Sequence, residues 1–292
     1  MTPLDEPPVR PTQTARWVVP VLVPLAAVCA AHLLIASADL GTLARSIAIG
    51  TAWGAALIAG MVVIALPALG SREGRRGVAV VASFILLTAL ASRLPPLPLF
   101  GPLERPWQGK IIDLIWVSLL FAVLWRWART EAGLRWRLEP GSTRPALITI
   151  VGVLALFAAL AAVSVALQPG TLTPVSAEEW AYDGTIPNLT EELIWRGAML
   201  AVLDHALGTP RTVLGAPVGW GIVITSVVFG LGHGILVDPS GVWSLDLAGG
   251  LFAVVMGLAY GWIRNRTGSI WPAFLLHCAP ELGLDLGLLI TS

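Results

Sequence analysis

The chain has 292 residues, of which 56% are hydrophobic and only 12% are charged, and its formal net charge is zero. Soluble domains carry about 25% charged residues, so this composition and a mean hydropathy of +0.79 indicate that lipid surrounds most of the chain. A neutral chain without a basic stripe does not favour nucleic acid as a partner. We therefore expect an integral membrane protein whose main surroundings are the lipid bilayer.

Apolar stretches long enough to span a bilayer, at about 20 residues each, follow one another along most of the chain. A polar, Pro-rich tail at residues 1–16 precedes the first of them. The candidate spans lie near residues 17–37, 45–69, 77–93, 111–127, 146–167, 189–207, 218–237, 245–263 and 270–290. This pattern predicts an all-α fold, a polytopic transmembrane helix bundle of about eight to nine spans.

One polar segment, at residues 128–145, divides the predicted spans into two groups. It is expected to be a linker between an N-terminal transmembrane region at 17–127 and a second transmembrane region at 146–292. Most arginines fall on one side of the bilayer when the N-terminus is placed inside. We expect a multi-pass protein of a cell membrane, taken here to be bacterial, and the side on which its functional residues open stays undecided.

Ionisable side chains inside a span cost about 2.5–3.5 kcal/mol on insertion scales, which makes the acidic cluster near residue 191 notable. Glu192 and Arg196 are four residues apart on one helix face and can form an ion pair. Glu191 points away from Arg196, and as an unpaired carboxylate it would be ready to take or give a proton. A simpler explanation is a helix start near Pro187 and Thr190, where the helix dipole favours acids in the first turn.

Two further polar pairs follow in the next apolar segments. Phe229 and His233 are four residues apart, and so are His277 and Glu281. A lone histidine is more often a satisfied core residue than a catalyst, but three polar sites in neighbouring spans are hard to explain by packing alone. Two histidines and up to three carboxylates match either a zinc site or the activation of a water molecule by a general base.

These three segments, taken in order, resemble the CPBP intramembrane proteases, which include the type II CAAX prenyl endopeptidases. The family pattern is Glu-Glu-x-x-x-Arg, then Phe-x-x-x-His, then His-x-x-x-Asn/Asp. The resemblance covers about 100 residues, from Pro187 to the end of the chain. One departure is Glu281, which stands where the family has Asn or Asp and which cannot donate a hydrogen bond to an oxyanion unless it is protonated.

The resemblance implies an intramembrane metalloendopeptidase that hydrolyses a membrane-associated substrate, such as a prenylated or leader-type peptide or a membrane protein. Glu191 would activate the attacking water, His233 would help to hold it, and His277 and Glu281 would complete the site. Supporting roles would fall to Glu192, Arg196 and Phe229. Whether Zn²⁺ is bound by His233, His277 and Glu191, or the glutamate and histidines act alone, is left open.

Two other classes of function remain in competition with the protease. A non-catalytic membrane partner, acting in immunity or secretion on the same scaffold, is favoured by the departure at Glu281. A proton-coupled transporter would use the same buried charges, but the two halves of the chain show no visible repeat. Loss of cleavage on replacing Glu191, or ion flux that depends on it, would discriminate between these classes.

Overall fold

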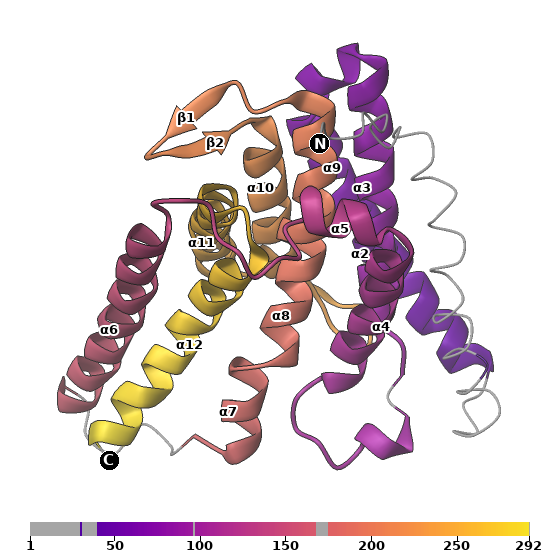
Figure 1. Ribbon diagram of the computed structural model, residues 1–292. Helices are drawn as coiled ribbons and strands as arrows, with labels where there is room; N and C mark the ends of the chain where they lie inside the picture. The colour runs from indigo at the N-terminus through magenta and orange to yellow at the C-terminus, as the bar shows by residue number, and fades with distance from the viewer. Residues whose placement is uncertain (1–29, 31–39, 96, 168–174, 292) are drawn as a thin grey trace.

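Long helices dominate the computed structural model, which describes Ala30 and residues 40–95, 97–167 and 175–291 (Figure 1). Within these residues, five helices are long and apolar enough to cross a membrane. They are α2 (Leu40–Ile64), α3 (Arg72–Ala91), α6 (Thr143–Leu167), α11 (Leu247–Thr267) and α12 (Ile270–Thr291). The predicted all-α, polytopic membrane fold is confirmed.

Shorter helices fill the segments between the long ones. They are α4 (Trp107–Val123), α5 (Trp125–Thr130), α7 (Ala177–Asp183), α8 (Ile186–Glu192), α9 (Leu200–Leu207) and α10 (Trp220–Gly234), with the 3₁₀ turns η2 (Leu66–Gly70) and η3 (Pro98–Phe100) and the π-helical η4 (Leu193–Met199). The predicted spans at 111–127, 189–207 and 218–237 overlap helices of this group. The predicted span at 17–37 lies outside the described residues except for Ala30.

Two small antiparallel hairpins interrupt the helical pattern. Strands β1 (Arg211–Val213) and β2 (Ala216–Val218) form the first hairpin, and β3 (Ile235–Val237) and β4 (Trp243–Leu245) form the second. The second hairpin shows that the predicted span at 218–237 extends too far, because the helix ends at Gly234.

The turn that follows β3 closes the hairpin after this helix. The carboxylate of Asp238 accepts hydrogen bonds from the backbone amides of Ser240 and Val242 at 2.8 and 2.9 Å. Gly241 adopts a φ of +89°, which side chains other than glycine's rarely allow. An Asp-Pro-Ser-Gly turn therefore folds the chain back, although the flanking residues are apolar enough to suggest a continuous span.

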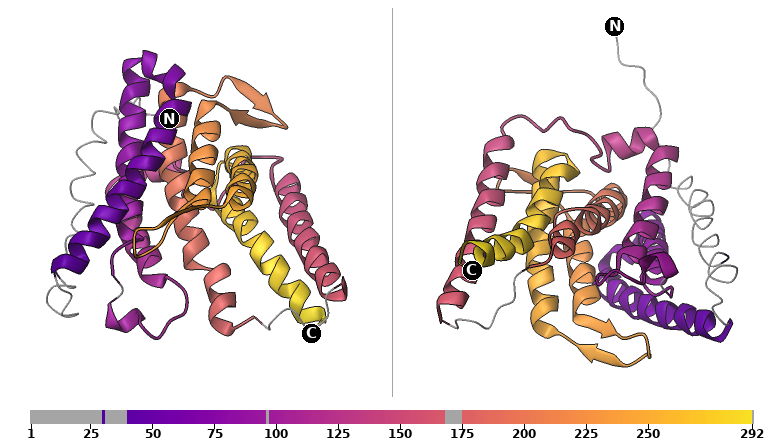
Figure 2. Two further views of the ribbon diagram at one scale, coloured as in Figure 1. Left: turned by 180° about the vertical axis from the view of Figure 1, so that it is seen from behind. Right: turned by 90° about the horizontal axis from the view of Figure 1, so that it is seen from below.

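The helices are arranged so that the polar residues of the C-terminal half meet in the middle of the molecule. Helix α8, η4 and α9 follow one another as one rod, and α10 packs against α9, α11 and α2 (Figures 1 and 2). Helix α4, from the N-terminal half of the chain, contacts α8. On the other side of α8, helix α12 contacts α8 and runs along α6. The helices α8, α10 and α12, which carry predicted site residues, thus border the same region as the N-terminal helix α4.

Glycines permit the close packing of α11 against its neighbours. A Cβ atom on Gly257 would lie 3.0 Å from Nη2 of Arg196 and 3.1 Å from Cα of Ser226. A Cβ atom on Gly261 would lie 3.2 Å from Cγ2 of Ile222. These two glycines therefore let the helices approach closely, and Gly257 lies against the buried arginine of the site.

Candidate active site

The buried ion pair between Glu192 and Arg196 is the centre of the site. Nη1 of Arg196 donates to Oε1 of Glu192 at 2.9 Å, and both side chains are fully buried. The guanidinium also lies over the rings of Phe229 and Tyr260, 4.3 and 4.9 Å from their centroids. The i, i+4 pair expected from the sequence is confirmed, and the two aromatic faces stabilise the cation in its dry surroundings.

The helix start predicted near Pro187 is confirmed, but it does not explain the two acids. Helix α8 begins at Ile186 and has no acidic residue in its first turn. Glu191 and Glu192 are its last two residues, directly before the π-helical stretch η4. Irregular turns of this kind occur often at functional sites, and here the turn carries Arg196.

His277 of α12 is held by the same carboxylate that holds Arg196. Its Nδ1 lies 2.9 Å from Oε1 of Glu192, and its ring stacks on Tyr260 with centroids 4.5 Å apart. Because a carboxylate only accepts hydrogen bonds, this contact places a proton on Nδ1 and leaves Nε2 of the neutral ring as an acceptor. That Nε2 faces Oε2 of Glu191 at 3.8 Å.

Glu191 has a cation partner that was not expected. Nζ of Lys110 forms an ion pair with Oε1 of Glu191, and the side chains are only 24% and 17% exposed. The expectation of an unpaired carboxylate is therefore wrong. Lys110 lies in the first turn of α4. The two residues are 81 positions apart in the chain, so no local spacing could have revealed the pair.

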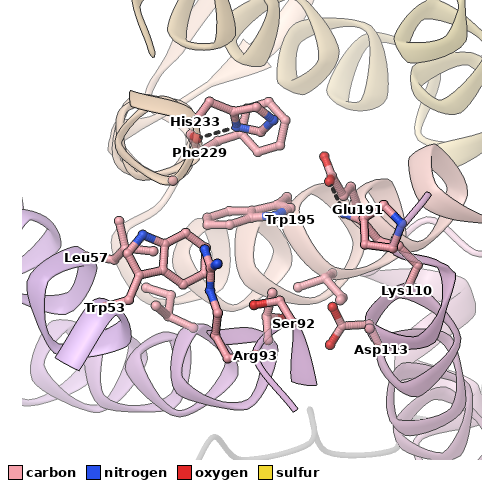
Figure 3. Close-up of a pocket in the computed structure, with 16 residues that line it drawn as sticks. Trp53, Leu57, Ser92, Arg93, Lys110, Asp113, Glu191, Trp195, Phe229 and His233 are labelled. Atoms are coloured by element: carbon pink, nitrogen blue, oxygen red, sulfur yellow. Dashed lines mark hydrogen bonds and ion pairs between the residues drawn. The ribbon is translucent and has the colours of Figure 1, made fainter. Parts of the chain in front are cut away.

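Glu191, Lys110 and His233 line one cavity of about 310 Å³. Figure 3 shows the Glu191–Lys110 pair on one wall and His233 with Phe229 on another. Nδ1 of His233 lies 2.9 Å from the carbonyl oxygen of Phe229, one helical turn earlier in α10. Because a carbonyl oxygen only accepts hydrogen bonds, Nδ1 carries the proton of this bond, and Nε2 takes no part in it. Glu191 thus connects the cavity with His277.

Glu281 lies one turn beyond His277 on α12 and is held by a residue that the sequence did not single out. Nδ2 of Asn188 donates to Oε2 of Glu281 at 2.6 Å and to the carbonyl oxygen of Asp183 at 2.7 Å. The asparagine is buried in α8, one turn before the acidic pair. Glu281 therefore links α12 to α8 beside the site.

The donor set does not fit a zinc ion in this arrangement. Among the described residues, no group of three or more His, Cys, Asp or Glu side chains is placed to hold a metal. One oxygen of Glu191 is taken by the ammonium of Lys110, which would repel a divalent cation, and Nδ1 of His277 is bonded to Glu192. The chemistry derived below therefore uses protein groups and water alone.

Comparison with protein families assigns the segment that carries these residues. Residues 173–282, somewhat more than a third of the chain, match the family model described as Type II CAAX prenyl endopeptidase Rce1-like. We call residues 173–282 the Rce1-like domain because of their similarity to this family model. No curated protein and no solved structure matches the chain.

The Rce1-like domain contains every site residue that the sequence predicted, from Glu191 to Glu281, and runs from the segment before α7 into α12. Lys110 lies outside it. The CAAX protease-like resemblance is confirmed, and the chain is an integral membrane protein whose residues 173–282 are similar to a membrane protease family.

Proposed function

We propose that this protein is an intramembrane endopeptidase that hydrolyses a peptide bond of a membrane-associated substrate with a water molecule activated by Glu191. The observation that carries the proposal is the 3.8 Å approach of Oε2 of Glu191 to Nε2 of His277. Each atom belongs to a side chain that is fixed at its other end, by Lys110 and by Glu192 respectively. Two fixed acceptors therefore face the same point.

A water molecule at this point can donate one hydrogen bond to each acceptor, which leaves a lone pair of its oxygen free for attack. Glu191 takes a proton as the water oxygen bonds to the carbonyl carbon of the substrate. The tetrahedral intermediate carries the negative charge on the former carbonyl oxygen. Glu191 then returns the proton to the leaving amine nitrogen as the C–N bond breaks, which restores the carboxylate and releases an acid and an amine.

The other residues of the cluster hold this arrangement together. Glu192 and Arg196 fix the tautomer and orientation of His277, since an imidazole bonded through Nδ1 presents Nε2. The ring of Phe229 lies between Arg196 and His233, with centroid contacts of 4.3 and 4.4 Å. In this proposal His233 contacts the substrate across the cavity from Glu191.

A second cavity of about 620 Å³ adjoins the first and supports a peptide as substrate. The two cavities share Ser92, Arg93, Pro106 and Gly109. The two adjoining cavities lie between the loop before α4 and Glu191 and offer more room than a single water or ion requires. An extended segment of a prenylated or leader-type substrate is the kind of ligand we propose for them.

The test is hydrolysis in H₂¹⁸O with the purified protein in detergent and a set of lipidated and leader-type membrane peptides. We expect internal cleavage of at least one peptide, with a single ¹⁸O atom in the new carboxyl group found by mass spectrometry. Folded protein that cleaves none of them, or protein reconstituted in liposomes that instead carries a Glu191-dependent ion flux, would contradict the proposal.

A further inference from the structure

We infer that Lys110 is a positioning residue of the peptidase site, and that its ammonium group holds the Glu191 carboxylate in the orientation from which it activates water. The inference rests on the proposed function and extends it to helix α4, which lies outside the Rce1-like domain. The N-terminal region would then supply part of the catalytic arrangement rather than only a membrane scaffold.

The place of Lys110 in its helix argues against a role in helix stability. It is the only lysine of the chain and the fourth residue of α4. The positive end of the helix dipole lies at this turn, where a cation is unfavourable and an acid would be preferred. Its side chain is also largely removed from solvent, so a carboxylate outside α4 has to compensate the charge.

The two oxygens of the Glu191 carboxylate have different neighbours. Oε1 is taken by Lys110 and Oε2 faces His277. A carboxylate anchored through one oxygen loses most of its freedom to rotate about its last side-chain bond, so the other oxygen keeps its direction. Glu192 differs in this respect, since Arg196 and His277 both contact its Oε1.

A second acid on the same cavity wall makes the cation more important. Asp113, one turn after Lys110, is 3% exposed, and its Oδ1 accepts a hydrogen bond from Nε1 of Trp116 at 2.7 Å. Glu191 and Asp113 both line the cavity. Lys110 lines the same cavity as both acids, so its ammonium group offsets negative charge beside Glu191.

The ion pair can be tested without any substrate, because the protein has a single lysine. Amine-reactive labelling of Lys110, followed by peptide mass spectrometry, reports how firmly its ammonium is held by Glu191. We expect Glu191→Gln to raise the labelling rate about five-fold or more, since the bound carboxylate keeps the amine protonated and unreactive. The matched control is Glu139→Gln, which removes a surface carboxylate that pairs with Arg135 and should leave the rate unchanged.

The positioning role is tested by cleavage kinetics of Lys110→Met and Lys110→Arg. The methionine variant should lower kcat about 10- to 100-fold and change KM less than about three-fold, because substrate binding is kept while the base is misplaced. The arginine variant keeps a cation and should recover most of kcat. Arg72→Met removes an exposed cation from the first turn of α3 and should cleave like the wild type.

The outcomes separate this inference from the proposed function. Equal labelling rates in wild type and Glu191→Gln, or wild-type kcat in a folded Lys110→Met variant, would overturn the role of Lys110 while leaving the protease intact. A wild-type protein that cleaves nothing would contradict the protease, and the labelling rate would still decide whether Lys110 and Glu191 are paired. A kcat that falls equally in Lys110→Met and Lys110→Arg would show that charge is not what the site requires.

Discussion

The carboxylate of Glu192 contacts both Arg196 and His277, and the Glu192–His277 bond joins residues that are 85 positions apart at 2.9 Å. One fully buried acid therefore connects the charge balance of α8 and η4 with the orientation of an imidazole on α12. The same contact determines which ring nitrogen faces Glu191. Stability and chemistry depend here on the same three side chains.

Removing the cation of this network should destabilise the fold. Arg196→Met leaves Glu192 charged and buried without its partner, and breaking a buried pair in this way costs about 3–5 kcal/mol. We expect a clearly lower unfolding temperature in detergent. Adding Glu192→Gln to Arg196→Met should restore part of the loss because no buried charge remains, and two independent, additive losses would contradict the pairing.

The hydrogen bond between Asn188 and Glu281 predicts different effects for two substitutions at Glu281. Glu281→Gln keeps a carbonyl oxygen for the amide of Asn188 and should retain both fold and cleavage. Glu281→Ala removes the carboxylate acceptor of that buried amide, at a cost of about 1–3 kcal/mol. Thermal unfolding of the two variants checks this, and a Gln variant as unstable as the Ala variant would refute it.

Acid should release the loop before α4 from α7. The backbone N–H of Arg105 donates to Glu178 at 2.9 Å and lowers the pKa of this carboxyl below its usual range, with further bonds from the amide of Glu104 and the indole of Trp107. A lowered pKa in the folded protein means that the stabilisation is present above the ordinary glutamate pKa and is lost as the pH falls through the lowered value.

Hydrogen exchange of the amides of Glu104 and Arg105 measures this release. Their protection, corrected for the intrinsic exchange rate, should be constant near neutral pH and fall only in the acid range. In Glu178→Gln it should be reduced already at neutral pH and show no further acid step. Protection that falls between pH 6 and pH 8 in the wild type would contradict the account.

Metal removal should leave cleavage intact. The ammonium of Lys110 occupies one oxygen of Glu191, and in the described part of the chain no three His, Cys, Asp or Glu side chains are placed to hold a divalent cation. We expect purified protein to retain its rate after dialysis against a chelator, with less than stoichiometric zinc by elemental analysis. Stoichiometric zinc that disappears in both His233→Ala and His277→Ala would instead establish a metal centre.

Local patterns in the sequence predicted the features that depend on neighbouring residues. Hydropathy located the helices because burial in lipid requires long apolar runs, and the i, i+4 spacing of Glu192 and Arg196 sufficed to predict their ion pair. The hairpin after Gly234 was missed, since apolar residues on both sides of the Asp238 turn resemble a continuous span. Five helices among the described residues are long and apolar enough to be clear membrane-spanning candidates, while α10 is apolar but shorter.

The partners of the site residues could not be predicted, because they come from distant parts of the chain. Lys110 and Glu191 are 81 positions apart, and Asn188 and Glu281 are 93 positions apart. A motif gives the chemical groups of a site but not the residues that neutralise or orient them, which depend on how α4, α8 and α12 pack. The only usable signal was a single lysine close to an apolar helix.

The measurement that tests the central claim most directly is the single-turnover cleavage rate of Glu191→Gln beside the wild type, with a peptide that the wild type hydrolyses. Glutamine has nearly the same shape but cannot take the proton of water, so the rate should fall by about 10²–10⁴ while the unfolding temperature shows that the variant is folded. A folded Glu191→Gln protein that cleaves the peptide at the wild-type rate would show that another group activates the water.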